Sequence, residues 1–229
     1  MSERGAPTAV AAIAIAIALA LPAPIAAAQA LDCPQKPPQI TIEIVSPKPR
    51  IDRSRTREKL TRESAERPPG DVHTLGLYSA LWSMTASREV ASLVESGGRE
   101  NRGCAWLDKV AIRVEARPRL IYLARELQPR TCRYAAVLAH ERKHVAVDDA
   151  VLAEAAGALS ARLADALADL RTPAPVRLTG LDELRRRFID ESESRINAMW
   201  QAITDERNRR QRDIDSPEEY ARVEAECRR

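Results

Sequence analysis

The feature that most constrains this chain is a long helical segment that carries two histidines four residues apart. Residues 140–144 read H-E-R-K-H, and the sequence on both sides is rich in Ala, Val and Leu and lacks Gly and Pro. Such a segment predicts one continuous helix, in which positions i and i+4 lie on one face about one turn apart. His140 and His144 can therefore reach one metal ion at the ~2.0–2.1 Å that is typical of zinc.

Glu141 lies between the two histidines and has a side chain that can transfer protons. A carboxylate beside an open metal position can accept the proton of an activated water molecule and later pass it to a leaving amine. The pattern H-E-x-x-H is typical of zinc metallopeptidase helices, and two of the three histidines in the chain belong to it. The middle residues, Arg142 and Lys143, are charged where the stricter motif has uncharged residues, so they should point to solvent or into the cleft. The alternative is two surface histidines with no metal.

A catalytic zinc ion usually has three protein ligands, and the sequence offers several third candidates. If the motif helix folds back near residue 176, a returning helix brings residues near 208–212 opposite the two histidines. Asp215 follows where that helix should end, and we predict it as the third ligand, although an Asp before Ser-Pro also suits a helix cap. His73 and Asp213 are the alternatives.

Asp148 lies one turn beyond His144. On a straight helix it is roughly 12 Å along the axis from His140, which is too far for one shared metal ion. It is better placed to orient His144, or it is simply a solvated charge.

The first thirty residues predict a secretory signal. An apolar run from Ala9 to Leu21 follows Arg4, and Ala28-Gln29-Ala30 forms an A-x-A cleavage site. The run is too short for a stable membrane span. We therefore expect cleavage after Ala30 and a periplasmic or secreted bacterial protein.

All four cysteines lie beyond this signal, and an even number in an exported chain predicts two disulfides. Three pairings are possible. We favour Cys104–Cys132, which would join a β-hairpin to the start of the motif helix, together with Cys33–Cys227, which would join the two ends.

The charge of the chain is nearly balanced, with 36 basic and 33 acidic residues and a net charge of +3. Aromatic residues are scarce, and no stripe combines aromatic with basic residues, so we expect no nucleic-acid partner. The expected partner is a protein or peptide substrate in the cell envelope.

Alternating apolar and polar residues predict strands at Ile40–Val45 and at Ala105–Glu115. A mostly apolar stretch at Arg119–Ala124 follows, and residues 116–118 would form the turn of a β-hairpin.

Three helices should follow these strands. The motif helix is expected at Thr131–Arg171 with Thr131 as its N-cap, residues 172–180 break it, and a second helix spans Leu181–Arg212. Ser216–Glu219 forms a capping box that starts a last helix ending near Cys227.

The order of these elements predicts an α+β fold: a small, mostly antiparallel sheet, then the H-E-x-x-H helix and a long helical hairpin. We expect residues 31–229 to form a single domain, with residues 31–130 mainly strands and loops and 131–229 mainly helical.

The stretch Cys104–Asp149 resembles a bacterial family of secreted zinc-dependent proteases with the H-E-x-x-H motif. The resemblance implies a zincin-like fold and the usual roles for His140, His144 and Glu141. The family also carries a histidine in a C-terminal motif, Y-D-x-x-T-x-H-G, whereas the nearest stretch here, residues 214–220, has none. If that histidine matters, this chain has replaced it or lost activity.

The sequence thus predicts an exported zinc metallopeptidase that hydrolyses peptide bonds with Glu141 as general base. A strand of the predicted hairpin Ala105–Ala124 could align an extended substrate by β-augmentation. One alternative is a non-catalytic envelope interaction module with a vestigial metal motif. Another is a zinc hydrolase that acts on a non-peptide amide of the cell wall.

Overall fold

The computed structural model describes residues 31–64, 73–96 and 101–227, so the predicted signal at residues 1–30 lies outside the described residues. Residues 31–229 form one compact unit. Five strands and four helices follow in the chain: β1 (Gln39–Val45), β2 (Arg50–Asp52), α1 (Arg57–Glu63), β3 (Gly76–Glu95), β4 (Arg102–Leu123), α2 (Cys132–Ala166), β5 (Val176–Arg177), α3 (Leu178–Ile214) and α4 (Pro217–Ala225). None of these helices combines the length and the apolar character that a membrane crossing requires.

The five strands form one sheet around β4, the strand to which all the others pair. β1 and β2 run parallel to β4 along one of its edges, and β3 runs antiparallel along the other edge. β5 adds a short antiparallel pairing at the start of β4. The α+β class is confirmed, but the sheet is mixed, so the prediction of a mostly antiparallel sheet is wrong.

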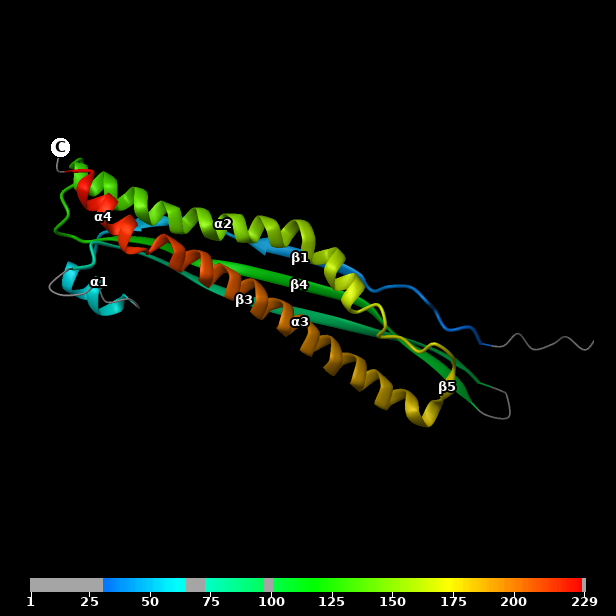
Figure 1. Ribbon diagram of the computed structural model, residues 1–229. Coiled ribbons are helices and arrows are strands. Elements are labelled where there is room, and N and C mark those ends of the chain that lie inside the picture. Colours follow the sequence, from blue (N-terminus) through cyan, green and yellow to red (C-terminus); the bar gives the residue numbers. More distant parts are fainter. Residues whose placement is uncertain (1–30, 65–72, 97–100, 228–229) are drawn as a thin grey trace, which may run out of the picture. The chain divides into compact units, whose positions relative to one another are not determined.

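Residues 105–124 do not form the predicted hairpin, because β4 continues through them as one strand (Figure 1). Arg117 and Pro118 form a bulge opposite Leu81, between the pairs Ala80–Arg119 and Trp82–Ala116. A proline has no N–H to donate to a ladder, and a bulge is a position in a sheet that tolerates this loss. The antiparallel partner of β4 is instead β3, which precedes it in the chain.

Two disulfides are present, as predicted, but the favoured pairing is wrong. The bonds are Cys33–Cys104 and Cys132–Cys227. Since β4 is one extended strand, at about 3.3 Å per residue it separates Cys104 from the start of α2 by tens of ångströms. Cys33 lies beside Cys104 because the segment before β1 runs along that end of β4, and Cys227 follows α4 back to the start of α2.

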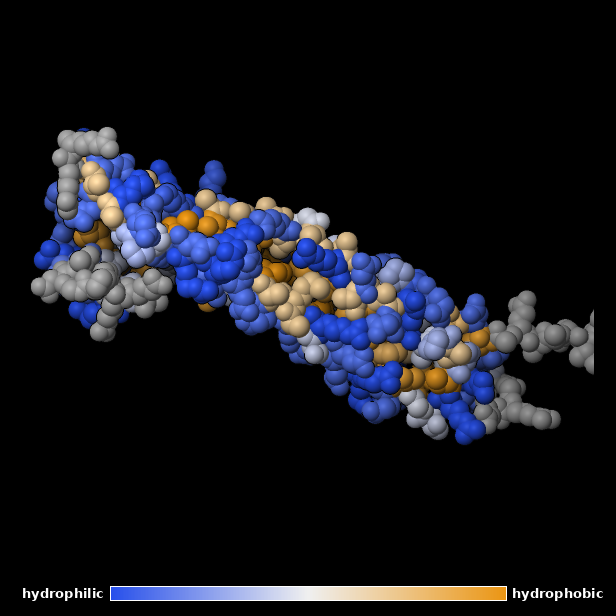
Figure 2. All heavy atoms as spheres, in the orientation of Figure 1, coloured by the Kyte–Doolittle hydropathy of each residue, from blue (hydrophilic) through white to orange (hydrophobic). Residues whose placement is uncertain are grey.

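The core lies between one face of the sheet and the two long helices. Val110, Ile112 and Val114 of β4 pack against Leu163 of α2 and Phe188 of α3, and all five are at most 3% exposed. Each such buried side chain contributes about 1.5–3 kcal/mol. Figure 1 shows both helices running along the sheet, and Figure 2 shows a mostly hydrophilic face interrupted by patches of hydrophobic side chains.

The opposite face of the sheet is polar. There Arg113 pairs with Glu43 and Glu115, and Lys109 pairs with Glu89. The domain therefore has two layers, a sheet and a layer of helices, and the helical layer carries the predicted metal ligands.

Two of the three predicted helices start at the predicted caps, whereas α3 starts at Leu178, three residues before its predicted start. The hydroxyl of Thr131 accepts a hydrogen bond from the backbone N–H of Tyr134, and Ser216 does the same for Glu219 at the start of α4. α2 ends at Ala166, five residues before the predicted end. The next turn places Leu167 and Leu170 in the core, where they are 1% and 2% exposed.

Candidate metal centre

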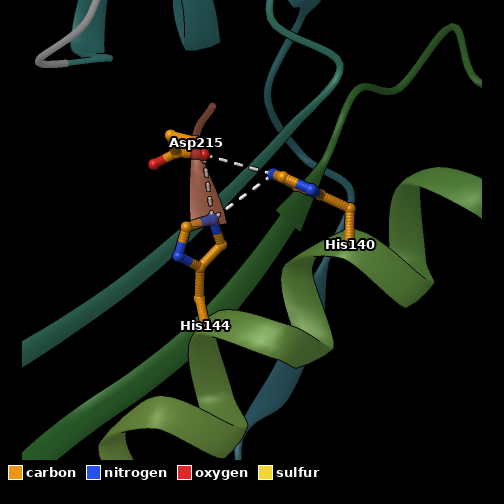
Figure 3. Close-up of side chains that lie close together, drawn as sticks. All are labelled: His140, His144 and Asp215. Carbon is orange, nitrogen blue, oxygen red and sulfur yellow. Dashed lines mark hydrogen bonds and ion pairs between the residues drawn. The ribbon is translucent and has the colours of Figure 1, made fainter. Parts of the chain in front are cut away.

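His140 and His144 extend from one face of α2 toward Asp215, which follows the last residue of α3 (Figure 3). Oδ1 of Asp215 lies 3.2 Å from Nε2 of His140 and 3.1 Å from Nε2 of His144. The two Nε2 atoms are 3.3 Å apart. One ligand atom from each residue thus lies within 4.8 Å of the others, and this group could hold a metal ion.

The helical hairpin brings Asp215 to the histidines. α3 returns along α2, as the contacts of Arg207 with Asp148 and of Gln211 with His144 indicate. α3 ends at Ile214, and the chain turns at Asp215 toward the site before α4 begins. Asp215 is therefore both the C-cap of α3 and the neighbour of the two histidines.

The two alternative third ligands lie elsewhere. Asp213 faces away and pairs with Arg209 at 2.9 Å on the exposed side of α3. His73 is exposed before β3 and does not belong to the group of three. Among the described residues, Asp215 is the carboxylate that the fold places with His140 and His144.

α4 lies against the same group. The hydroxyl of Tyr220 donates to Oδ1 of Asp215 at 3.0 Å, and its ring lies 5.5 Å from the ring of His140. Oε1 of Glu219 is 3.4 Å from Nδ1 of His140 and 2.6 Å from Nζ of Lys143. The charge of Lys143 is thus paired with Glu219 beside the site.

Glu141 is 4% exposed and lies next to the three-residue group without joining it. Burial raises the pKa of its carboxyl to about 7, although the positive potential of the two histidines and the backbone N–H of Tyr78 act in the opposite direction. A Cβ at Gly76, the first residue of β3, would lie 2.3 Å from Oε1 of Glu141. Because glycine has no side chain, Gly76 leaves room for the carboxylate of Glu141.

The electrostatics of the ligand residues favour a cation. Burial raises the pKa of Asp215, but the neighbouring imidazoles of His140 and His144 outweigh it and hold this pKa far below its usual range. Burial lowers the pKa of His144, but Asp215 and Glu141 reverse the effect and leave it raised. The negative charges of Asp215 and Glu141, which favour a proton on His144, would also favour a bound metal ion.

Two residues at the site carry no signal in the sequence. Gln211 of α3 places Oε1 2.5 Å from Nδ1 of His144, and it lies between that ring and the buried Asp148. The sequence predicts that Asp148 orients His144. In the structure the side chain of Gln211 lies between them and contacts both. Gly76 was also missed, because a single glycine at a strand start has many explanations.

The chain was compared with family models, with curated proteins and with solved structures, and none of the three comparisons found a match. Two imidazoles and one carboxylate are a donor set found in catalytic zinc sites, which leave the fourth position to water or substrate. The three residues could hold a metal ion, and the carboxyl group of Glu141 lies beside them.

Proposed function

We propose that this protein is an exported zinc-dependent metallopeptidase, in which His140, His144 and Asp215 hold Zn²⁺. The observation that carries the proposal is the meeting of Asp215 with the two histidines of an H-E-x-x-H helix. A chance H-E-x-x-H pattern does not require a carboxylate from the far end of another helix at 3.1–3.2 Å. The resemblance to secreted zincin-like proteases points to the same activity.

In this proposal Glu141 is the general base. A zinc ion at this site supplies Lewis-acid chemistry, which polarises a carbonyl group and activates a water molecule. Glu141 accepts the proton of that water and returns it to the leaving amine. A pKa of about 7 suits both tasks, because the carboxyl group then gains and loses a proton near neutral pH.

The proposed substrate is an extended peptide or protein segment of the cell envelope. β4 cannot align it, because both edges of β4 are paired. Among the described strands, none pairs with the second edge of β3, and this strand begins at Gly76 beside Glu141. We therefore assign substrate alignment by β-augmentation to the start of β3. Two disulfides fit a protein that is exported to an oxidising compartment.

The test is Glu141→Gln in the mature protein, assayed on unfolded protein substrates and, separately, on cell-wall fragments. The variant should fold, keep the zinc content of the wild type and lose ~10²–10⁴-fold in turnover. Equal cleavage rates for the variant and the wild type would show that Glu141 is not the general base. If the wild type cleaves cell-wall amides and no protein substrate, the protein is a zinc hydrolase of the cell wall and not a peptidase.

A non-catalytic envelope interaction module is the second candidate function. The observation that favours it is burial: His140, Glu141 and His144 are each at most 7% exposed, and α4 lies against them. In that case the zinc-loaded wild type would cleave none of the substrates, and Glu141→Gln would not change partner binding.

A further inference from the structure

The candidate metal centre is linked to a buried polar network behind it. Asp148 of α2 is fully buried, and both of its oxygens accept hydrogen bonds. Oδ1 accepts from Nε of Arg207 at 2.7 Å and from Nε2 of Gln211 at 2.8 Å. Oδ2 accepts from the hydroxyl of Tyr78 at 2.9 Å and from Nε1 of Trp82 at 3.0 Å. Asp148 is thereby fixed from β3 and α3 at once.

This network determines which way the amide of Gln211 points. Its Nε2 also donates to the backbone carbonyl of His144 at 3.0 Å. Asp148 Oδ1 and a carbonyl oxygen both act as acceptors here, so the NH₂ group must face them. Oε1 is consequently turned toward Nδ1 of His144, at 2.5 Å.

An amide oxygen cannot donate a hydrogen bond, so this short contact is favourable only when Nδ1 of His144 carries a proton. We propose that Gln211 is a positioning residue, which keeps the proton of neutral His144 on Nδ1 and leaves the Nε2 lone pair directed at His140 and Asp215. The inference deepens the proposed metal site, but it concerns the metal-free imidazole and is testable without turnover.

The competing acceptor is Asp215, which lies 3.1 Å from Nε2 and would draw the proton to that nitrogen. Oδ1 of Asp215 has other donors, since the Tyr220 hydroxyl lies at 3.0 Å and Nε2 of His140 at 3.2 Å. Oε1 of Gln211 has Nδ1 of His144 as its donor. A proton on Nε2 would leave two lone pairs facing each other at 2.5 Å, whereas a proton on Nδ1 leaves the Nε2 lone pair facing Oδ1 of Asp215 at the longer distance of 3.1 Å. The shorter contact with Gln211 therefore favours the Nδ1–H form.

The direct test is nitrogen NMR of the imidazole side chains in metal-free wild-type protein, at an alkaline pH where the rings are neutral. The chain has three histidines, and the exposed His73 serves as an internal reference. His144 should carry its proton on Nδ1. A proton on Nε2 of His144 would overturn the proposal, whether or not the protein binds zinc or cleaves a peptide.

Variants then test the role of Gln211. Gln211→Met keeps the side-chain length and removes the acceptor, so the proton of His144 should move to Nε2, where it opposes metal binding. Zinc affinity, measured by competition with a chelator, should fall ~10–100-fold, as for other groups that orient metal-binding histidines.

The matched control is Gln201→Met, on the same helix, because the side chain of Gln201 is exposed and donates to Asp205 one turn away at 2.8 Å. It should change neither the tautomer nor the affinity. An unchanged His144 tautomer in Gln211→Met would contradict the proposal. If Gln211→Met does not fold, the wild-type spectrum alone decides.

Discussion

At the scale of single residues, the closest constraint on the proposed general base is a glycine. A Cβ at Gly76 would approach Oε1 of Glu141 to 2.3 Å and Cγ1 of Val137 to 2.7 Å, so Gly76→Ala must displace the Glu141 carboxylate. We expect turnover to fall toward the ~10²–10⁴-fold loss of a missing base, with zinc content retained. The assay is a comparison of turnover and bound zinc in the same preparation.

The matched control for that substitution is Gly157→Ala, because a Cβ at Gly157 of α2 meets no atom within 4 Å. This variant should keep full activity and gain ~0.4–1 kcal/mol in stability, since alanine restricts the unfolded chain. Wild-type turnover in Gly76→Ala would show that the position of the Glu141 carboxylate does not limit the reaction.

The buried carboxyl of Glu141 should also make stability depend on pH. Its pKa is about 7 in the folded protein against an ordinary 4.5, because burial disfavours the charged form. The folded protein therefore binds this proton more tightly than the unfolded chain does. The resulting stabilisation is full below the unfolded pKa and is lost as the pH rises through the folded value.

The amide side chain in Glu141→Gln does not titrate, so the stability of this variant does not fall for this reason as the pH rises. Between about pH 4 and pH 8, the unfolding free energy of the metal-free variant should gain ~2–3 kcal/mol relative to wild type, at ~1.36 kcal/mol per pKa unit. Urea unfolding of both proteins across this range measures the difference. A difference that stays constant with pH would show that Glu141 titrates as an exposed carboxyl.

Residue-scale prediction from the sequence worked where spacing carried the information. The i,i+4 spacing placed His140 and His144 on one face, and the expected return of a second helix pointed to Asp215. Gln211 and Gly76 could not be found in the same way. Their importance lies in one hydrogen bond and one close approach across elements, and neither leaves a periodic pattern in the sequence.

At the scale of elements, α4 is attached to the rest of the domain at both ends. Asp215 and Ser216 connect it to α3, and Cys227 at its far end bonds to Cys132 at the start of α2. Glu219 and Tyr220 of this helix contact His140 and Asp215. The disulfide therefore holds one side of the candidate metal centre in place.

We expect the double substitution Cys132→Ser and Cys227→Ser to weaken zinc binding, because Asp215 and Tyr220 then lose the restraint on α4. Stability should fall by ~2–5 kcal/mol. The measurement is a chelator competition beside thermal unfolding. The control removes Cys33–Cys104, which is buried away from the metal centre, and should lower stability while leaving the zinc affinity of the folded protein unchanged. Equal zinc affinities in both double variants would contradict this role for α4.

The elements themselves were predictable to different degrees. Helix starts followed local caps such as Thr131 and Ser216, whose side chains bond within a few residues. Strand pairing did not follow local patterns: Pro118 suggests a turn, yet β4 continues through it because a bulge in β4 accommodates the proline opposite Leu81 of β3. The disulfide pairing failed for the same reason, since the length of β4 separates Cys104 from Cys132.

At the scale of the whole molecule, the two long helices and the sheet form the core, while the candidate metal centre joins α2 to the junction of α3 and α4. A metal ion that binds only the folded protein adds RT ln(1 + [L]/Kd) to its stability, about 2.7 kcal/mol at 100 times Kd. The mature protein should therefore unfold at a higher temperature with zinc than after chelation, and His140→Ala should not respond to zinc.

The most direct test of the proposed metal centre is the zinc content of purified mature protein after zinc addition and dialysis, measured together with that of His140→Ala and Asp215→Ala. We expect about one zinc ion per wild-type chain, none in His140→Ala and a large loss of affinity in Asp215→Ala. A folded wild-type protein that holds no zinc would contradict the proposed metal centre. Full zinc content in Asp215→Ala would contradict the proposed set of three ligands.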